Sequence, residues 1–180
     1  MRSGDVATDF TRPGDYQLYW LAQDLGRAAY HALFRGVPPL VVGALLFGVR
    51  LPHAPLTWTA FLISLILAAT VSFALRFMVN LSAFWLLDYR GAGRMAAALW
   101  TFLSGFAVPI AFFPEPLRTA ALALPFAAFV EVPVTVFLEK APGVALGAAL
   151  LFQAGWAAAL LLLGRGVLAA ARRRLVIQGG

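Results

Sequence analysis

The chain has 180 residues, of which 62% are apolar and only 12% are charged. A soluble domain of this length is close to half apolar and a quarter charged, so this composition indicates an integral membrane protein. The absence of cysteine excludes a disulfide framework and a thiolate metal site. The net charge of +6 comes from arginines and one lysine placed beside apolar runs, which is typical of membrane topology and not of nucleic-acid binding.

Residues 1–35 are predicted to form a cytoplasmic loop and an amphipathic helix. Between residues 15 and 35, apolar side chains recur at spacings of three and four, and polar side chains cluster on the other side. Asp15 is the expected N-cap, because its carboxylate can accept hydrogen bonds from the first amides of a helix. Tyrosine and tryptophan are frequent between residues 16 and 30, as they are at membrane interfaces. We therefore expect an interfacial helix that lies along the headgroups.

The transmembrane domain is expected over 36–180, with four spans at about 36–51, 56–76, 95–113 and 143–164. The first apolar run, residues 37–49, covers roughly 20 Å of a hydrocarbon core about 30 Å thick, so it needs flanking residues to cross. The run 56–75 is 20 residues long and crosses on its own. Pro38 and Pro39 predict a helix start or a kink, and Pro109 predicts a kink near the far end of the third span.

The stretch 114–142 is apolar and about long enough to cross a bilayer, but Pro125, Glu131 and Pro133 lie within it. Arginine is abundant at both ends of the chain, so the positive-inside rule places both termini in the cytoplasm and requires an even number of spans. The four clear spans meet that condition, whereas a fifth would place Arg172 to Arg174 outside. We therefore expect residues 117–138 to form a re-entrant helical hairpin on the outer side. Pro125 and Pro133 would divide it into short helical pieces packed against the spans.

Four ionisable residues admit two interpretations each. Glu131 marks a functional site if it lies at membrane depth, but the nearby Pro133 and lysine favour a place at the outer interface. Arg76 either faces a cavity or an anionic substrate, or extends to the inner headgroups, which we favour. Asp88 and Arg90 read mainly as a cytoplasmic turn, and with Arg76 they are candidates for a pathway or an interface.

Catalytic motifs are absent from the sequence. A P-loop needs Gly-Lys followed by Ser or Thr, but the single lysine, Lys140, lies between Glu139 and Ala141. The histidines are too isolated to predict a metal site. A membrane-embedded enzyme of lipid metabolism remains an alternative that would use Asp15 and Asp24, and a non-transporting membrane scaffold or a secondary transporter is another.

Several ordered segments together carry a family resemblance. They are "RSGDVA" (2–7), "RPGDYQLYWLAQDLGR" (12–27), "AFWLLDYRGAGR" (83–94), "LSGFAVPIAFFPEPLRTAALALPFAAFVEVP" (103–133) and the terminal "RRRLVIQGG". With these segments the chain resembles the membrane subunit of bacterial type-2 ABC exporters. The family pattern has six spans, and its first two have no counterpart here.

The resemblance implies an all-α permease subunit of an ATP-driven export system in the bacterial inner membrane. Such a permease pairs with a second permease, identical or not, and docks a separate ATPase that binds ATP and magnesium, so no cofactor is expected in this chain. The family's cytoplasmic loop corresponds to residues 2–12, which makes Arg2, Asp5, Arg12 and Asp15 candidates for the ATPase contact. Its outer re-entrant segment corresponds to 114–142, where Pro125, Glu131 and Pro133 would gate the pathway.

Overall fold

The computed structural model describes residues 15–85 and 89–172, and these residues form helices joined by loops, without a strand. In chain order the elements are α2 (Tyr16–His31), the π-helix η1 (Ala32–Gly36), α3 (Val37–Phe47), α4 (Pro55–Leu81), the 3₁₀ turn η2 (Ser82–Phe84), α5 (Tyr89–Leu103), η3 (Ile110–Phe112), α6 (Glu115–Ala123), η4 (Ala127–Phe129), α7 (Glu131–Phe137) and α8 (Val144–Arg172).

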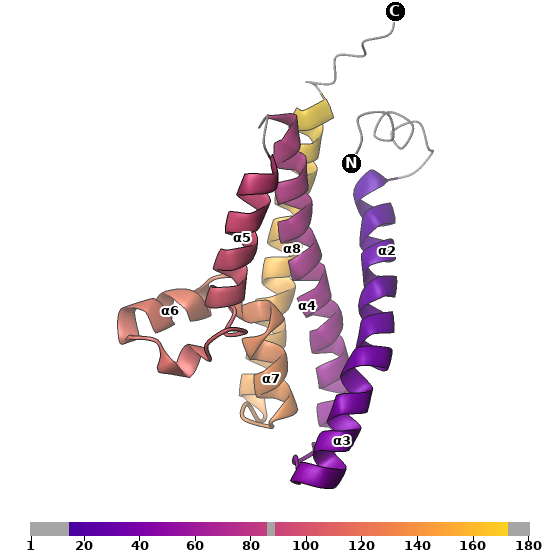
Figure 1. Cartoon of the computed structure of the whole chain (residues 1–180), viewed down its shortest axis with the longest axis vertical. Helices are drawn as coiled ribbons and strands as arrows, with labels where there is room; N and C mark the ends of the chain where they lie inside the picture. The colour runs from indigo at the N-terminus through magenta and orange to yellow at the C-terminus, as the bar shows by residue number, and fades with distance from the viewer. Residues whose placement is uncertain (1–14, 86–88, 173–180) are drawn as a thin grey trace, which may run out of the picture.

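The helices form an elongated bundle in which α4 and α8 run side by side along the long axis (Figure 1). The start of α2 and the ends of α4 and α8 meet at one end, here called the terminal end. The loops 48–54 and 138–143 lie at the other, here called the loop end. Small and branched residues, among them Val71, Ala74 and Ala157, fill the contact between α4 and α8. A second cluster nearer the terminal end is aromatic, with Phe73 and Phe77 packed on Leu168.

Three helical stretches are long and apolar enough to cross a membrane: Tyr16–Phe47, Pro55–Phe84 and Val144–Ala171, with 32, 30 and 28 residues. At about 1.5 Å per residue each exceeds a hydrocarbon core of roughly 30 Å, so each extends beyond the core or tilts within it. Together with the absence of strands among the described residues, these helices confirm the predicted all-α membrane class.

The expected division between an interfacial helix and a first span is not a break in the structure. Helices α2, η1 and α3 form one continuous stretch, and Asp15 caps it as predicted, since its Oδ1 accepts from the amides of Gln17 and Leu18 at 2.9 and 3.1 Å. Pro38 and Pro39 lie in the first turn of α3, at a predicted helix start, although the helical stretch continues through them. They follow the π-helix, whose wider turn lets the Val37 amide donate to the Ala32 carbonyl just before the prolines.

The third predicted span, 95–113, is helical only as far as Leu103 in α5. Gly105 ends the helix with a left-handed φ of +84°, and the amide of Ala107 donates back to the carbonyl of Thr101 at 3.1 Å. A methyl group at Gly105 would lie 3.1 Å from Ile110, so only glycine fits here without displacing a neighbour. Pro109 thus follows the helix end instead of kinking a longer helix.

Between α5 and α8 the chain forms the short helices α6, η4 and α7, in place of one long helix. Pro125 separates α6 from η4, as predicted, but Pro133 lies in the first turn of α7, where its missing amide costs no hydrogen bond. In Figure 1, α6 extends sideways and α7 returns along the bundle. Phe137 of α7 packs edge-on against Trp58 and at 5.0 Å against Phe61, both of α4.

Gln153 joins three of these elements inside the bundle. Its Nε2 donates to the backbone carbonyls of Ala128 in η4 at 2.6 Å and Ser64 in α4 at 3.2 Å, and the side chain is fully buried. In the described part of the chain, its Oε1 and the nearby Ser64 Oγ have no hydrogen-bond partner. The glutamine therefore gives the Ala128 carbonyl, in a short 3₁₀ helix, a donor that lipid cannot provide.

Removing the two hydrogen bonds that Gln153 donates, here called the Gln153 clamp, should destabilise the fold. Gln153→Leu keeps the side-chain volume but removes both donated hydrogen bonds and leaves the Ala128 carbonyl buried without that donor. We expect a loss of about 1–2 kcal/mol in unfolding free energy, measured by denaturant titration in lipid micelles. The matched control Ser64→Ala removes a hydroxyl that makes no bond to the clamp and should stay within about 0.5 kcal/mol of wild type. Equal losses in the two variants would contradict the assignment.

Candidate functional site

A cavity of about 350 Å³ lies between α2 and α4 toward the terminal end. One face of each helix lines it, at spacings of three and four residues. The lining residues are Tyr16, Trp20, Asp24 and Arg27 from α2 and Phe73, Arg76, Phe77, Asn80, Leu81 and Phe84 from α4 and η2.

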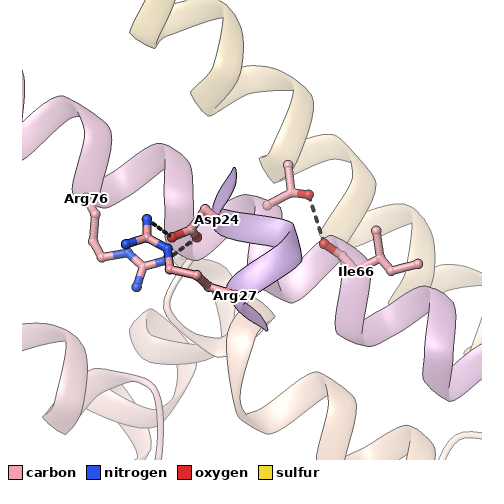
Figure 2. Close-up of polar contacts among 5 residues, drawn as sticks. Asp24, Arg27, Ile66 and Arg76 are labelled. Atoms are coloured by element: carbon pink, nitrogen blue, oxygen red, sulfur yellow. Dashed lines mark hydrogen bonds and ion pairs between the residues drawn. The ribbon is translucent and has the colours of Figure 1, made fainter. Parts of the chain in front are cut away.

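Three charged side chains form one wall of the cavity (Figure 2). Asp24 accepts from Nη2 of Arg76 at 2.6 Å and from Nη2 of Arg27 at 3.2 Å. The Asp24 side chain is only 13% exposed, whereas those of Arg76 and Arg27 are 50% and 64% exposed. A nearly buried carboxylate thus ties the two arginines together, and the group carries a net charge of +1.

Aromatic rings form the other wall. Tyr16 packs on Trp20 and on Phe77, with ring centroids 6.2 and 6.1 Å apart, and Phe73 stacks on Phe77 at 5.4 Å. The indole Nε1 of Trp20 is buried and has no hydrogen-bond partner among the described residues. Burying a hydrogen-bond donor without an acceptor costs free energy, so an acceptor atom of a ligand would bind favourably at this wall.

Two further polar contacts attach α2 to α8. Asp15 pairs with Arg165 at 3.2 Å, and the buried Gln17 donates from Nε2 to the carbonyl of Leu161 at 3.0 Å. The helices approach closely here, since a methyl group on Gly164 would lie 3.0 Å from Nε2 of Gln17. Together with Asp24, these contacts fix the start of α2 on both α4 and α8.

The structure places only part of the predicted ATPase contact. Arg2, Asp5 and Arg12 lie outside the described residues, and so does Asp88. Arg90 lies in α5, but its side chain is outside the described part. Asp15 has two structural roles, as the cap of α2 and as the partner of Arg165.

The three candidates for an outer gate lie in the short-helix segment but do not form one group. Glu131 begins α7 and lies beside the end of α5, because a methyl group on Gly105 would be 3.3 Å from its Oε2. Pro133, two residues further on in the same first turn, is buried, and Pro125 lies in the turn before η4. Glu131 therefore contacts the place where α5 stops.

Sequence reasoning missed the partners that give these sites their geometry. From the sequence, Asp24 was considered as a candidate for an enzyme site and not for an ion pair. Its spacing of three from Arg27 on a helix nevertheless predicts such a pair. Gln153 was overlooked, although a lone glutamine in an apolar helix is itself a signal for interhelical hydrogen bonding. The contact between Asp24 and Arg76 joins residues 52 positions apart, and no local pattern predicts it.

Glu139 was also missed, and it fastens the loop end. Its Oε1 accepts from the hydroxyl of Thr57 at 2.9 Å and from the amides of His53 and Ala54 at 3.2 and 3.4 Å, which caps the start of α4 from a distant loop. The Thr57 hydroxyl first, then the Ala54 amide, lower the pKa of the Glu139 carboxyl from its ordinary value. Glu139 holds this position with a left-handed φ of 56°.

The enzyme alternative needs aspartates that converge on a metal. Asp15 and Asp24 instead pair with arginines of different helices, Arg165 and Arg76. Among the described residues, no three His, Asp or Glu side chains lie close enough together to hold a metal ion.

The long apolar helices and the buried polar clamps between them define an all-α integral membrane protein. Residues 1–179 match the family described as ABC-2 family transporter protein, so the chain belongs to that family and has a permease role in an ABC transporter. This confirms the resemblance drawn from the sequence. No curated protein matches the chain, and no solved structure matches it.

The Glu139 cap predicts a pH-dependent stability. Because its folded-state pKa is lowered, the carboxylate contributes stability at neutral pH that disappears as the pH falls through that lowered pKa. Glu139→Gln should therefore lower the thermal midpoint at neutral pH, and the gap from wild type should close in acid. Thr57→Val, which removes the strongest donor, should move the closure to higher pH. A gap that is independent of pH would rule out the charged cap.

Proposed function

We propose that the chain is a membrane-spanning permease subunit of an ATP-driven export system, which forms the substrate pathway with a second permease and docks a separate ATPase. The observation that carries this proposal is the family match over residues 1–179, combined with the long apolar helices. In the partner, ATP would bind with magnesium and be hydrolysed, and this chain would move helices around the pathway.

Exposed apolar surface supports the need for a second membrane subunit. Helix α3 has no buried residue, and its side chains Leu45, Leu46 and Phe47 are 79%, 74% and 80% exposed. Lipid can cover such a helix, but it cannot enclose a polar pathway, which needs protein on all sides. We therefore assign the remaining wall of the pathway to a second permease.

Charge supports placing the terminal end in the cytoplasm of a bacterial cell, with this chain in the inner membrane. Arg27, Arg76 and Arg165 lie toward this end, where α8 ends at Arg172, and Arg173 and Arg174 follow in the sequence. The positive-inside rule gives the arginine-rich side to the cytoplasm. The ATPase would then dock at the terminal end, and the short-helix segment with Pro125, Glu131 and Pro133 would gate the outer mouth.

Within the ATPase contact, we assign the docking role to Arg2, Asp5 and Arg12. Asp15 is already engaged by the cap of α2 and by Arg165, so its substitution would disturb the bundle itself. Arg76, Asp88 and Arg90 are proposed to lie along the pathway or at the permease interface on the cytoplasmic side.

Docking is tested by co-purification. The triple variant Arg2→Ala, Asp5→Ala, Arg12→Ala leaves α2 capped, and it should reduce recovery of a co-expressed P-loop ATPase from the same gene neighbourhood by about tenfold. The matched control Glu115→Ala, Arg118→Ala changes charges on α6 and should leave recovery unchanged. Wild-type protein that recovers no ATPase would contradict the proposed function, and an unaffected triple variant would contradict the docking site.

Topology is tested by labelling intact cells. A tag fused after Gly180 and a tag placed before Met1 should both be shielded from a membrane-impermeant reagent until the cells are opened. A cysteine introduced in place of Ala141, in the loop between α7 and α8, should react from outside. Labelling of the carboxyl-terminal tag in intact cells would overturn the even number of crossings.

A further inference from the structure

The cavity between α2 and α4 combines features that a plain helix contact does not need. Aromatic rings of Tyr16, Trp20 and Phe77 line one part, and the charged group Asp24, Arg27 and Arg76 lines the other. The space between the helices is left open at about 350 Å³, near the lower end of the size range of ligand pockets. The cavity therefore suits a ligand with an apolar part and an ionic part.

The polar atoms of the cavity are mostly donors. Asp24 uses Nη2 of each arginine, so the remaining guanidinium N–H groups of Arg27 and Arg76 stay available to an anion. The side-chain amide of Asn80 adds a neutral donor. The buried indole N–H of Trp20, which lacks an acceptor among the described residues, lies on the aromatic wall of the same cavity. Donors around a net positive charge select a ligand rich in acceptor oxygens.

The level of the cavity identifies the kind of anion. Counting from Leu56 at the loop end, 20 uncharged residues of α4 cover about 30 Å, the thickness of a hydrocarbon core, and Arg76 is the next residue. Tyrosine and tryptophan favour the same boundary. The anion at this level in a bilayer is the phosphate of a phospholipid.

We propose that this cavity is a binding site for an anionic phospholipid of the leaflet at the terminal end. The phosphate lies between the guanidiniums of Arg76 and Arg27, and a headgroup or ester oxygen accepts from the indole of Trp20. The headgroup occupies the cavity, and the acyl chains run toward the loop end over the exposed apolar side chains of Leu33 and Phe34. The site uses the membrane placement of the chain and does not depend on transport or on an ATPase.

The site also explains why the ion group is arranged as it is. A pair of Asp24 with one arginine would have no net charge. Because Asp24 pairs with both Arg27 and Arg76, it orients both guanidinium groups and leaves one positive charge for the lipid. A bound lipid would bridge α2 and α4 alongside the Asp24 contact, and would hold the two helices at their observed separation.

Lipid selection is the test. The purified full chain is placed in nanodiscs with equal amounts of phosphatidylglycerol and phosphatidylcholine, and the lipids retained on extraction are counted by native mass spectrometry. Wild type should retain phosphatidylglycerol over phosphatidylcholine by about tenfold, and Arg76→Gln should lose that preference. Trp20→Phe keeps an aromatic ring, removes the indole donor and should reduce the preference by about threefold.

Arg165→Gln is the matched control, because Arg165 is also half-exposed and also pairs with an aspartate of α2, but it does not line the cavity. It should retain the wild-type preference within about twofold. The site would be overturned if Arg76→Gln and Arg165→Gln lost the phosphatidylglycerol preference equally. It would also be overturned if both Arg76→Gln and Trp20→Phe kept the wild-type preference. Displacement of the lipid by millimolar inorganic phosphate would show a free-phosphate site and overturn the lipid assignment, whereas no displacement supports it.

Discussion

The hydrogen bonds from one glutamine amide hold the irregular part of the molecule inside its bundle. Backbone that leaves the helical pattern at membrane depth must find donors and acceptors within the protein, because lipid offers none. Gln153 supplies such a donor to Ala128 and ties the same point to α4 through Ser64. Glu139 fastens the other end of the segment to the start of α4. With these two attachments, η4 and α7 stay packed against α4 and α8 without forming a long helix.

The terminal end follows a different principle, in which charge pairs determine how α2 sits on its neighbours. Asp15 binds Arg165 of α8, and Asp24 binds Arg76 of α4, so two aspartates of one helix secure two others. Exposed ion pairs contribute little stability, but the Asp24 side chain is nearly buried. Its pair with Arg76 therefore fixes where α2 lies on α4.

Composition and motif order predicted the class and the family, because both depend on features spread along the whole chain. The Asp15 cap was predictable because it is local. The end of α5 at Leu103 depends on the left-handed Gly105, and a glycine in an apolar run gives no unique signal. Pro133 was expected to divide a helix. It instead lies in the first turn of α7, and the sequence does not show that a helix begins at Glu131. The pair of Asp24 with Arg76 required the packing of α2 on α4.

The π-helix between α2 and α3 makes the first long helix a jointed one. Pro38 and Pro39 cannot donate to the carbonyls of the preceding turn, so the helix ladder is interrupted just where the anchored α2 meets α3, which has no buried residue. In a thinner or thicker bilayer, we expect α3 to change its tilt about this joint, while the contacts of Asp24 and Gln17 hold α2 in place. The mismatch between helix length and membrane thickness would then fall on α3 and not on the cavity.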